Sequence, residues 1–499
     1  MGAFDLSATV IGGNGTSITL PDVYATVDHP FHIARADTLL DNLRNGELTR
    51  WISHHQGGYP VEFYPLGAAW LDILIWAISF GTISIAAAHK LTLIGLFLLP
   101  GLAFALMSRR DRHPTGTAPL AFAMHIAVFG EWWSGGYTEL ISWGLVTNVA
   151  AAAAVLFSLH FAGAYVSGDA PFVLAAAVSS SAFALYANPR SIFALAVVGM
   201  ATLLTGANLG RRGHLRAAGR VAVIGGLTAL VAAPELLSLL RFQHLYTFLR
   251  YETYGTIGEY ARSSTQAVTM PVLLLAAVGI TIGLVRSRKG SGTRSASITL
   301  VLYVALTFVL TSSNSLSGII AQLETPRLMP FQRLLTIYLA AIAIAVTTRF
   351  VARGFKRPGL APLALGLMTA ALSVSFTVSV AKREAADERM APVESSASPA
   401  LADLISAVRL ADSRSADGTA LFVIGSALSW HAQLWAPLET DRPLFYDNWL
   451  WYWHTRHFGP YDFREGHSYL RPRDALDTDF FERHGIGAVV VTRLSQAAV

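Results

Sequence analysis

Long apolar stretches recur through the middle of the chain, and they constrain its fold more than any other feature. Ten runs are long enough to cross, or nearly cross, the roughly 30 Å hydrocarbon core of a bilayer. They cover residues 84–107, 117–134, 139–165, 171–187, 191–206, 218–240, 268–286, 296–312, 333–350 and 360–381. Hydrophobic residues make up 53% of the 499 and charged residues only 14%, whereas a soluble domain is about 25% charged. The sequence therefore predicts an α-helical polytopic membrane protein with about ten transmembrane helices.

The distribution of basic residues predicts how these helices are oriented. The loops after alternate helices are rich in arginine and lysine. They hold Arg109, Arg110, Arg112, Arg211, Arg212, Arg216, Arg286, Arg288, Lys289, Arg294, Arg349, Arg353, Lys356 and Arg357. The positive-inside rule makes these loops cytoplasmic, so residues 1–64, the intervening loops and everything after residue 382 are extracytoplasmic. Segment 65–80, which carries Asp72, would invert this alternation if it crossed the membrane, and we interpret it as a juxtamembrane helix on the bilayer surface.

The composition changes after the last apolar run, which indicates a separate domain. The stretches ALFVIG (420–425) and GAVVVT (487–492) are typical of short buried strands, and helices are predicted near 399–411 and 474–484. A small C-terminal extracytoplasmic α/β domain is therefore expected. The predicted organisation is a first extracytoplasmic loop at 1–64, a juxtamembrane helix at 65–80, a transmembrane bundle at 81–382, a linker at 383–398 and the α/β domain at 399–499.

Several classes of protein are excluded or unsupported. The absence of cysteine excludes disulfides, thiolate metal sites and cysteine nucleophiles. The net charge is only +5 and the basic residues form no nucleic-acid stripe, so no nucleic-acid partner is expected. No Walker loop, zincin motif or nucleophile elbow is present. The N-terminus has no signal peptide, and an extracytoplasmic first loop would require a transmembrane helix before residue 1.

The polar stretch before the first apolar run carries the first candidate site residues. Asp28 lies in the sequence DHPFH, with His29 and His32 beside it. A carboxylate within hydrogen-bond reach of a hydroxyl can take its proton as a new bond forms, so Asp28 is a candidate general base. Aspartate is also a favoured N-cap, and the alternative is that Asp28 caps a helix that starts near Phe31. One residue can do both.

A second cluster follows in the sequence HHQGGYPVEFYP. It contains His54, His55, Tyr59, Glu62 and Tyr64. Aromatic rings beside carboxyl and imidazole groups suit a sugar, whose C–H face stacks while its hydroxyls need polar partners. The alternative is a structural turn whose aromatic residues belong to an interfacial belt. The histidines of both clusters lack zinc-site spacing, so no metal ligand is assigned, no cofactor is certain and a divalent cation remains an open possibility.

A later polar loop adds carboxylates and tryptophans. The stretch EWWSGGYTE contains Glu131, Trp132, Trp133 and Glu139. Carboxylates at membrane depth are costly and by default functional, so both glutamates are candidate catalytic residues and both tryptophans candidate substrate contacts. Solvation at the interface is the competing account, and the sequence does not separate the two glutamates.

Four arginines are candidate ligands for a phosphate because the predicted extracytoplasmic loops hold few basic residues. A guanidinium matches the geometry of a phosphate and stays charged. The candidates are Arg190, Arg250, Arg327 and Arg333.

This pattern resembles the GT-C superfamily of integral-membrane glycosyltransferases, in particular bacterial arabinofuranosyl- and mannosyltransferases. The resemblance rests on DHPFH in the first loop, GGYPVEFYP before a surface helix, a second acidic loop and a C-terminal outer domain. It implies a GT-C-like bundle in the bacterial cytoplasmic membrane, with its site outside. It also implies transfer of a sugar from a polyprenyl-phosphate donor to a cell-envelope glycan or lipid acceptor. Asp28 would act as general base in a single displacement, with arginines at the leaving phosphate.

Two other functions fit a polytopic chain. One is a transporter or flippase of lipid-linked saccharides, in which intramembrane carboxylates bind substrate or relay protons. The charged residues of this chain instead cluster at helix ends, and no inverted repeat is visible. The other is a non-catalytic GT-C-like subunit that binds sugar or supports assembly.

Overall fold

The structure is a computed structural model of the whole chain. The residues that it describes are 7–11, 17–24, 28–47, 51–54, 59–60, 65–131, 133–168, 170–206, 210–242, 254, 256–285, 291–312, 324–385, 398–424, 436–446, 457–458, 461–462, 481–482 and 484–491. They divide into two compact units. Unit 1 comprises Met1–Thr92, Ser238–Arg250 and Asp387–Val499, and unit 2 comprises Leu93–Leu237 and Tyr251–Ala386.

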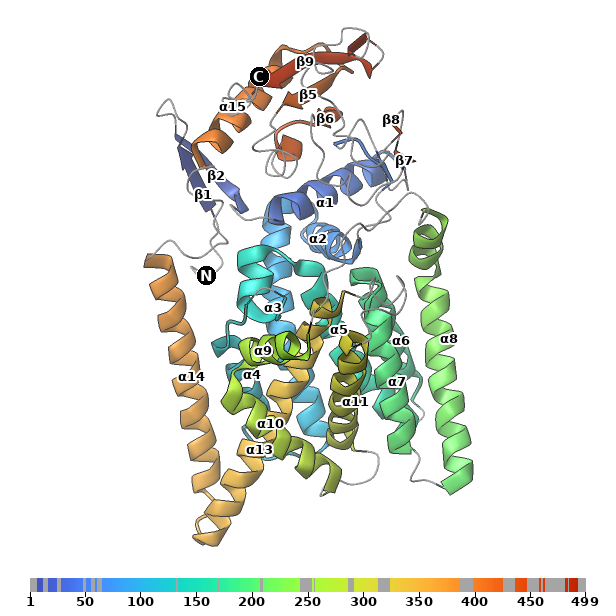
Figure 1. Cartoon of the computed structure of the whole chain (residues 1–499), viewed down its shortest axis with the longest axis vertical. Coiled ribbons are helices and arrows are strands. Elements are labelled where there is room, and N and C mark those ends of the chain that lie inside the picture. Colours follow the sequence, from blue (N-terminus) through green and yellow to red (C-terminus); the bar gives the residue numbers. More distant parts are fainter. Residues whose placement is uncertain are drawn as a thin grey trace. The chain divides into compact units, whose positions relative to one another are not determined.

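Unit 2 is a helical bundle that holds nearly all of the predicted apolar runs (Figure 1). A helix occupies all or most of each run. The helices are α3 (Ile85–Arg110), α4 (Thr117–Ala127), α5 (Val146–Gly168), α6 (Pro171–Ala187), α7 (Ser191–Gly206), α8 (Gly210–Phe242), α9 (Ile257–Val268), α10 (Met270–Val285), α11 (Gly292–Ser312), α13 (Met329–Gly354) and α14 (Leu360–Ala385). The start of α3 and the end of α8 belong to unit 1. A π-helical turn, η3 (Thr138–Trp143), precedes α5, and a 3₁₀ turn, η6 (Thr325–Leu328), precedes α13.

Six of the described helical segments are long and apolar enough to cross a membrane. They are Ile85–Arg110, Val146–Gly168, Gly213–Arg241, Gly292–Leu310, Thr325–Gly354 and Leu360–Lys382. Helices α9 and α10 together would make a seventh span, bent by 94°, while α4, α6 and α7 are shorter apolar helices. The ten predicted runs therefore correspond to these six or seven candidate spans and to the shorter apolar helices. Short apolar helices can lie among neighbours without spanning alone, so the described helices form a multi-pass membrane protein.

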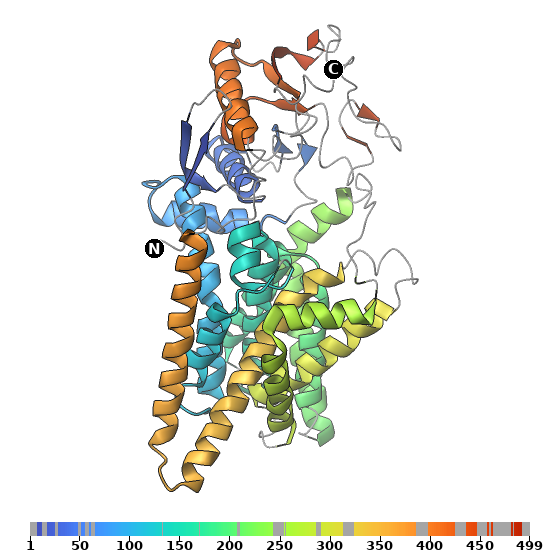
Figure 2. The same ribbon diagram turned by 60° about the vertical axis from the view of Figure 1, so that its left-hand side comes forward.

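Helix α13 forms the centre of the bundle. It packs against α4, α5, α10, α11 and α14, and its side chains from Met329 to Ala343 are buried on every face. A helix that is buried on every face belongs to the core of the bundle rather than to its lipid-facing surface. Helix α14 runs back beside α13 as the second arm of a hairpin, as Figure 2 shows, and keeps most of its apolar side chains exposed. Such exposure is expected of a helix that faces lipid.

The two ends of the bundle differ in charge. Arg110, in the last turn of α3, donates to the carbonyl oxygen of Gly163 (2.7 Å) near the end of α5. Arg353 lies in the last turn of α13. Two of the predicted arginine-rich loops therefore lie where α5 and α13 end. The opposite end of the bundle is where α5 and α13 begin.

Unit 1 combines residues from both ends of the chain. Strands β1 (Ser7–Ile11) and β2 (Ser17–Tyr24) form an antiparallel hairpin, and helices α1 (His29–Arg44) and α2 (Gly67–Ile78) pack against each other. Short pairs are formed by β3 (Trp51–Ile52) with β4 (Tyr59–Pro60) and by β7 (His457–Phe458) with β8 (Tyr461–Asp462). Helix α1 also contacts the 3₁₀ turn η7 (Ala436–Leu438), so the first predicted loop and the C-terminal region share one unit.

The predicted C-terminal α/β domain is confirmed. A three-stranded sheet in the order β6-β5-β9 is parallel throughout, and α15 (Ser398–Arg414) packs on β9. The strands are β5 (Ala420–Ile424), β6 (Leu444–Tyr446) and β9 (Ile486–Val491), and the first and last match the predicted strands. Phe422 and Phe445 form its core. Most of the helix predicted near 474–484 lies outside the described residues.

Candidate functional site

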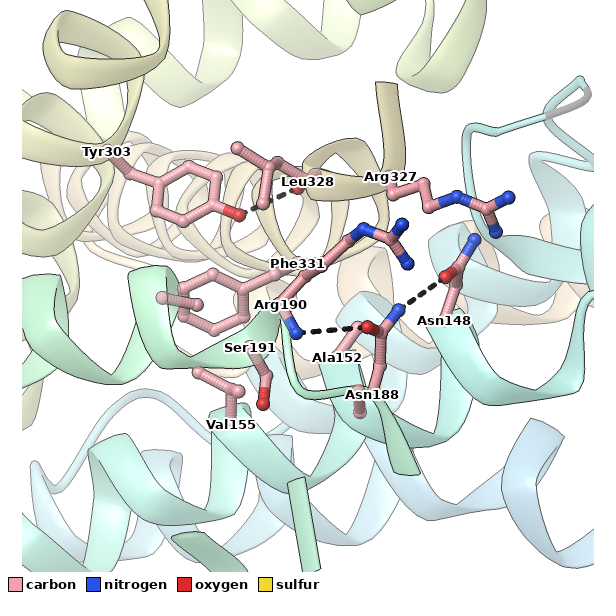
Figure 3. Close-up of a pocket in the computed structure, with 12 residues that line it drawn as sticks. Asn148, Ala152, Val155, Asn188, Arg190, Ser191, Tyr303, Arg327, Leu328 and Phe331 are labelled. Carbon is pink, nitrogen blue, oxygen red and sulfur yellow. Dashed lines mark hydrogen bonds between the residues drawn. The ribbon is translucent and has the colours of Figure 1, made fainter. Parts of the chain in front are cut away.

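A pocket lies in unit 2, where α6 ends and α5, α7 and α13 begin (Figure 3). Its empty volume is about 310 Å³, including space open to solvent. Polar groups and apolar side chains share its wall. The lining residues are Asn148, Ala151, Ala152, Val155, Asn188, Arg190, Ser191, Ala194, Tyr303, Arg327, Leu328 and Phe331. Two of the four predicted phosphate ligands, Arg190 and Arg327, are among them.

The break between α6 and α7 positions Arg190. Pro189 lacks a backbone N–H and disfavours a helical conformation at Asn188, so α6 ends at Ala187. The Asn188 side chain then accepts a hydrogen bond from the backbone N–H of Arg190 at 3.1 Å, a local Asx-type turn. The turn fixes the backbone position from which the Arg190 side chain extends, at the edge of the pocket.

A chain of hydrogen bonds connects this turn to the buried carboxylate of Glu139. Asn188 Nδ2 donates to Asn148 Oδ1 (2.7 Å), and Asn148 Nδ2 donates to Glu139 Oε1 (3.0 Å). Glu139 Oε2 accepts from the backbone N–H of Gly135. The backbone N–H groups of Gly135 and Arg190 can only donate, so they fix the orientation of both amides between them. All four hydrogen bonds of this amide chain form when both carboxylate oxygens of Glu139 act as acceptors.

Glu139 titrates near neutral pH. Burial raises its pKa from 4.5 to about 7, although the hydrogen bonds from Asn148 and Gly135 and the charges of Arg327 and Arg333 act in the opposite direction. A perturbed carboxyl group beside a pocket marks a candidate functional site. Glu131, by contrast, is exposed. The fold therefore separates two glutamates that the sequence left equivalent.

Arg190 and Arg327 are joined by a carboxylate that the sequence analysis missed. Arg190 Nη2 lies 3.1 Å from Glu324 Oε1, and Arg327 Nε donates to Glu324 Oε2. The Arg327 guanidinium also lies over the indole of Trp133, 4.2 Å from the ring centroid. A cation held over an indole face is stabilised by the ring quadrupole. The pocket thus has two ordered guanidinium groups at its edge.

Arg333 lies elsewhere in unit 2 and is almost fully buried. Its guanidinium donates to the carbonyl oxygens of His125 (2.8 Å), Val128 (2.6 Å) and Ala267 (3.2 Å). These bonds tie α13 to the loop after α4 and to α9. The geometry therefore favours a structural role for Arg333, and its predicted role as a phosphate ligand is not supported by these contacts.

Unit 1 holds a second polar cluster, at the start of α1. Asp28 occupies the N-cap position and is half-buried, but no described residue of α1 donates a capping hydrogen bond to its side chain. Its backbone oxygen accepts from the N–H of His32 at 3.1 Å. Capping by the carboxylate, the alternative explanation for Asp28, is therefore not observed. The adjacent His29 and His32 are buried rather than exposed.

His29 belongs to a buried chain of ionisable side chains that includes His89 and Asp72. His89 Nδ1 lies 2.9 Å from Asp72 Oδ2, and His89 Nε2 lies 3.0 Å from His29 Nδ1. Because the carboxylate accepts, His89 donates from Nδ1 and its Nε2 accepts from His29. His32 stacks on the His89 ring. The sequence analysis did not single out His89, although an ionisable residue in an apolar helix is a usable signal.

The remaining predicted substrate contacts are only partly described. His54 is buried in unit 1, where burial lowers its pKa to about 4 and keeps it neutral at pH 7. Tyr59 belongs to β4 and pairs with Ile52. His55, Glu62, Tyr64, Trp132 and Arg250 lie outside the described residues. Within the described part of the chain, no cluster of histidine and acidic side chains is arranged to hold a metal ion.

Comparison with known proteins supports the fold. No protein-family model matches the chain, and no curated protein sequence is significantly similar to it. The crystal structure of ArnT from Cupriavidus metallidurans in the apo state is similar over 99% of this chain and 91% of that chain, with a TM-score of 0.51 and 12% identity. The cryo-EM structure of the arabinofuranosyltransferase AftD from Mycobacteria matches 85% of this chain, with a TM-score of 0.47 and 12% identity. This chain spans only 28% of that AftD chain. The similarity to the ArnT structure confirms the fold expected from the sequence, a multi-helix membrane bundle with a small C-terminal α/β region.

Proposed function

We propose that the protein is a membrane glycosyltransferase that moves a sugar from a polyprenyl-phosphate donor to a glycan or lipid acceptor of the cell envelope. The observation that carries the proposal is the pair of guanidinium groups, Arg190 and Arg327, at a pocket inside an apolar bundle. Guanidinium groups bind phosphate with directed, charge-assisted hydrogen bonds. The GT-C-type fold agrees with this function but does not by itself establish it.

The apolar part of the pocket wall suits a lipid-linked phosphate rather than a soluble nucleotide. Ala151, Val155 and Phe331 line the pocket together with the arginines. They offer apolar contact to the first isoprene unit, while the guanidinium groups face the phosphate. The absence of a Walker loop in the sequence also speaks against a nucleotide phosphate site.

The charge of the bundle supports an extracytoplasmic site. The pocket lies where α5 and α13 begin, whereas Arg110 and Arg353 lie where these helices end. By the positive-inside rule the arginine-rich end is cytoplasmic. The proposed reaction then takes place on the outer side of the membrane. Its donor there is a polyprenyl-phosphate sugar rather than a nucleotide sugar.

The proposed mechanism is a single displacement. The acceptor hydroxyl attacks the anomeric carbon of the donor, its proton passes to Asp28, and the bond between that carbon and the phosphate oxygen breaks. The electrons of the broken bond stay on the polyprenyl phosphate. Arg190 and Arg327 offset the charge that develops on this leaving group. His29, His32 and His54 remain proposed as residues that shape the acceptor and sugar region.

The test is transfer from radiolabelled polyprenyl-phosphate mannose and arabinofuranose in proteoliposomes. Asp28→Asn should lower transfer by about 100-fold or more, the range for loss of a general base, while thermal stability is retained. Asp41→Asn is the matched control, because Asp41 is an exposed carboxylate on the same helix, paired with Arg44. Full transfer by Asp28→Asn would refute the assigned base. A wild-type protein that transfers no sugar but moves lipid-linked saccharide across the bilayer would favour the transporter.

A further inference from the structure

One carboxylate joins the two guanidinium groups of the pocket. Glu324 offers a separate oxygen to each arginine, Oε1 to Arg190 and Oε2 to Arg327. The Glu324 side chain is only 7% exposed, whereas those of Arg190 and Arg327 are 24% and 22% exposed. The Glu324 carboxylate is therefore covered, while both guanidinium groups reach the pocket surface. This is the arrangement of a fixed anion behind a binding surface rather than of an ordinary exposed ion pair.

The backbone at Glu324 is unusual for its residue type. Its φ is +46° and its ψ is 77°, in the left-handed region that disfavours side chains other than glycine, asparagine and aspartate. A residue held in this region is strained, and the surrounding contacts must offset the strain. The two arginine contacts and the start of η6 supply such contacts. A glycine would relieve the strain but would lose the carboxylate.

Glu324 also sets the charge that a ligand meets. Among the described residues at the pocket, Arg190 and Arg327 contribute two positive charges and Glu324 contributes one negative charge, which leaves one positive charge. Glu139 and Arg333 add one charge of each sign to the surroundings and cancel when Glu139 is ionised. A phosphodiester with one negative charge balances the remaining charge. A diphosphate carries two negative charges. Its second negative charge would face Glu324 without a positive charge to balance it.

We propose that Glu324 is a specificity-determining residue that matches the pocket to a lipid-linked monophosphate diester and disfavours a diphosphate. The inference rests on the proposed phosphate pocket and deepens it by naming the residue that selects the class of donor. Glu324 remains in place when the ligand binds and holds one face of each guanidinium. Selection arises because a second phosphate charge is repelled at short range by a covered carboxylate.

The experiment measures binding of two synthetic probes to detergent-solubilised protein. Methyl decaprenyl phosphate carries one negative charge, and methyl decaprenyl diphosphate carries two. In Glu324→Gln the shape is retained and the carboxylate charge is removed. The ratio of the dissociation constants, diphosphate over monophosphate, should fall by at least about tenfold relative to wild type, equivalent to ~1.4 kcal/mol. Both constants are measured on one preparation, so the ratio is independent of the folded fraction.

Two further variants make the result specific. Glu324→Asp keeps the charge and should keep the wild-type ratio within about threefold even if both affinities change. Glu259→Gln removes an exposed carboxylate of unit 2 and should leave the ratio unchanged. An unchanged ratio in Glu324→Gln, with both probes still bound, would overturn the role of Glu324 and leave the phosphate pocket standing. Failure of the wild-type protein to bind either probe would overturn the pocket and this inference together.

Discussion

Gly136 and Arg333 approach each other so closely that no side chain fits between them. A β-carbon on Gly136 would lie 2.8 Å from Arg333 Nη2 and 2.9 Å from the carbonyl oxygen of Phe129. The φ of Gly136 is +83°, which glycine adopts without strain. Arg333 needs this approach because its guanidinium bonds the loop after α4. The same loop leads into η3, which carries Glu139, so a buried arginine and a glycine together position the buried carboxylate.

The first prediction is that Gly136→Ala destabilises the protein by about 3 kcal/mol, because backbone strain and a clash with buried atoms add. The matched control is Gly46→Ala. Gly46 has a similar φ of +76°, but no described atom lies within 4 Å of its β-carbon position, so only about 1 kcal/mol of strain is expected. Thermal unfolding in detergent measures both. Equal losses for the two variants would show that the approach of Arg333 does not matter.

The second prediction concerns the amide chain between Glu139 and Arg190. Asn148→Asp places a second carboxylate at the 3.0 Å contact with Glu139 and should be strongly destabilising at pH 8. Glu139→Gln in the same protein should rescue it, because the new amide can donate to the new carboxylate, which still accepts from Asn188. We expect a favourable coupling energy of about 2 kcal/mol in the double-mutant cycle. Additive losses would mean that these side chains do not interact.

The third prediction is a pH dependence of stability that arises from Glu139. The pKa of Glu139 is about 7 in the folded protein, above its ordinary value of 4.5. The folded state therefore holds the proton more tightly than the unfolded state. The resulting stabilisation is complete below the unfolded pKa and is lost as the pH rises through the folded pKa. The loss is on the order of 3 kcal/mol.

Glu139→Gln removes this titration and provides the reference. The stability of wild type minus that of the variant should fall between about pH 4.5 and pH 8 and stay level outside this window. Thermal unfolding at a series of pH values gives the difference. A difference that grows with pH would contradict the prediction, and it would mean that the hydrogen bonds to Glu139 and the charge of Arg333 outweigh its burial.

Local signals predicted the helices, whereas the site depends on contacts between distant residues. The apolar run at 333–350 predicts α13 because hydropathy is a local property, whereas burial on every face depends on the helices that surround α13. Glu131 and Glu139 look alike in the sequence and differ only because the turn at Gly135 and Gly136 brings one of them inside. No local pattern indicates that Glu324 reaches Arg190. The Asp72–His89 contact likewise depends on how α2 packs on α3.

The fourth prediction concerns the indole that supports Arg327. Trp133→Ala should raise the KM for the lipid-linked donor roughly threefold to thirtyfold, because a cation–π contact contributes about 0.5–2 kcal/mol. The kcat should change less, since Arg327 keeps its contact with Glu324. Trp133→Phe retains an aromatic face and should give an intermediate KM. A fall in kcat alone, at constant KM, would assign Trp133 to the reacting centre instead of to donor binding.

The last prediction concerns the buried chain from Asp72 through His89 to His29. His89→Ala leaves the Asp72 carboxylate and the His29 imidazole without these hydrogen bonds in a site closed to water. Loss of the central partner should destabilise the protein by about 3 kcal/mol. Asp72→Asn should cost only about 1 kcal/mol, because the amide oxygen can still accept from His89 Nδ1. Thermal unfolding in detergent ranks the two variants. A larger loss for Asp72→Asn than for His89→Ala would show that the carboxylate charge, rather than the hydrogen-bonded chain, stabilises the start of α1.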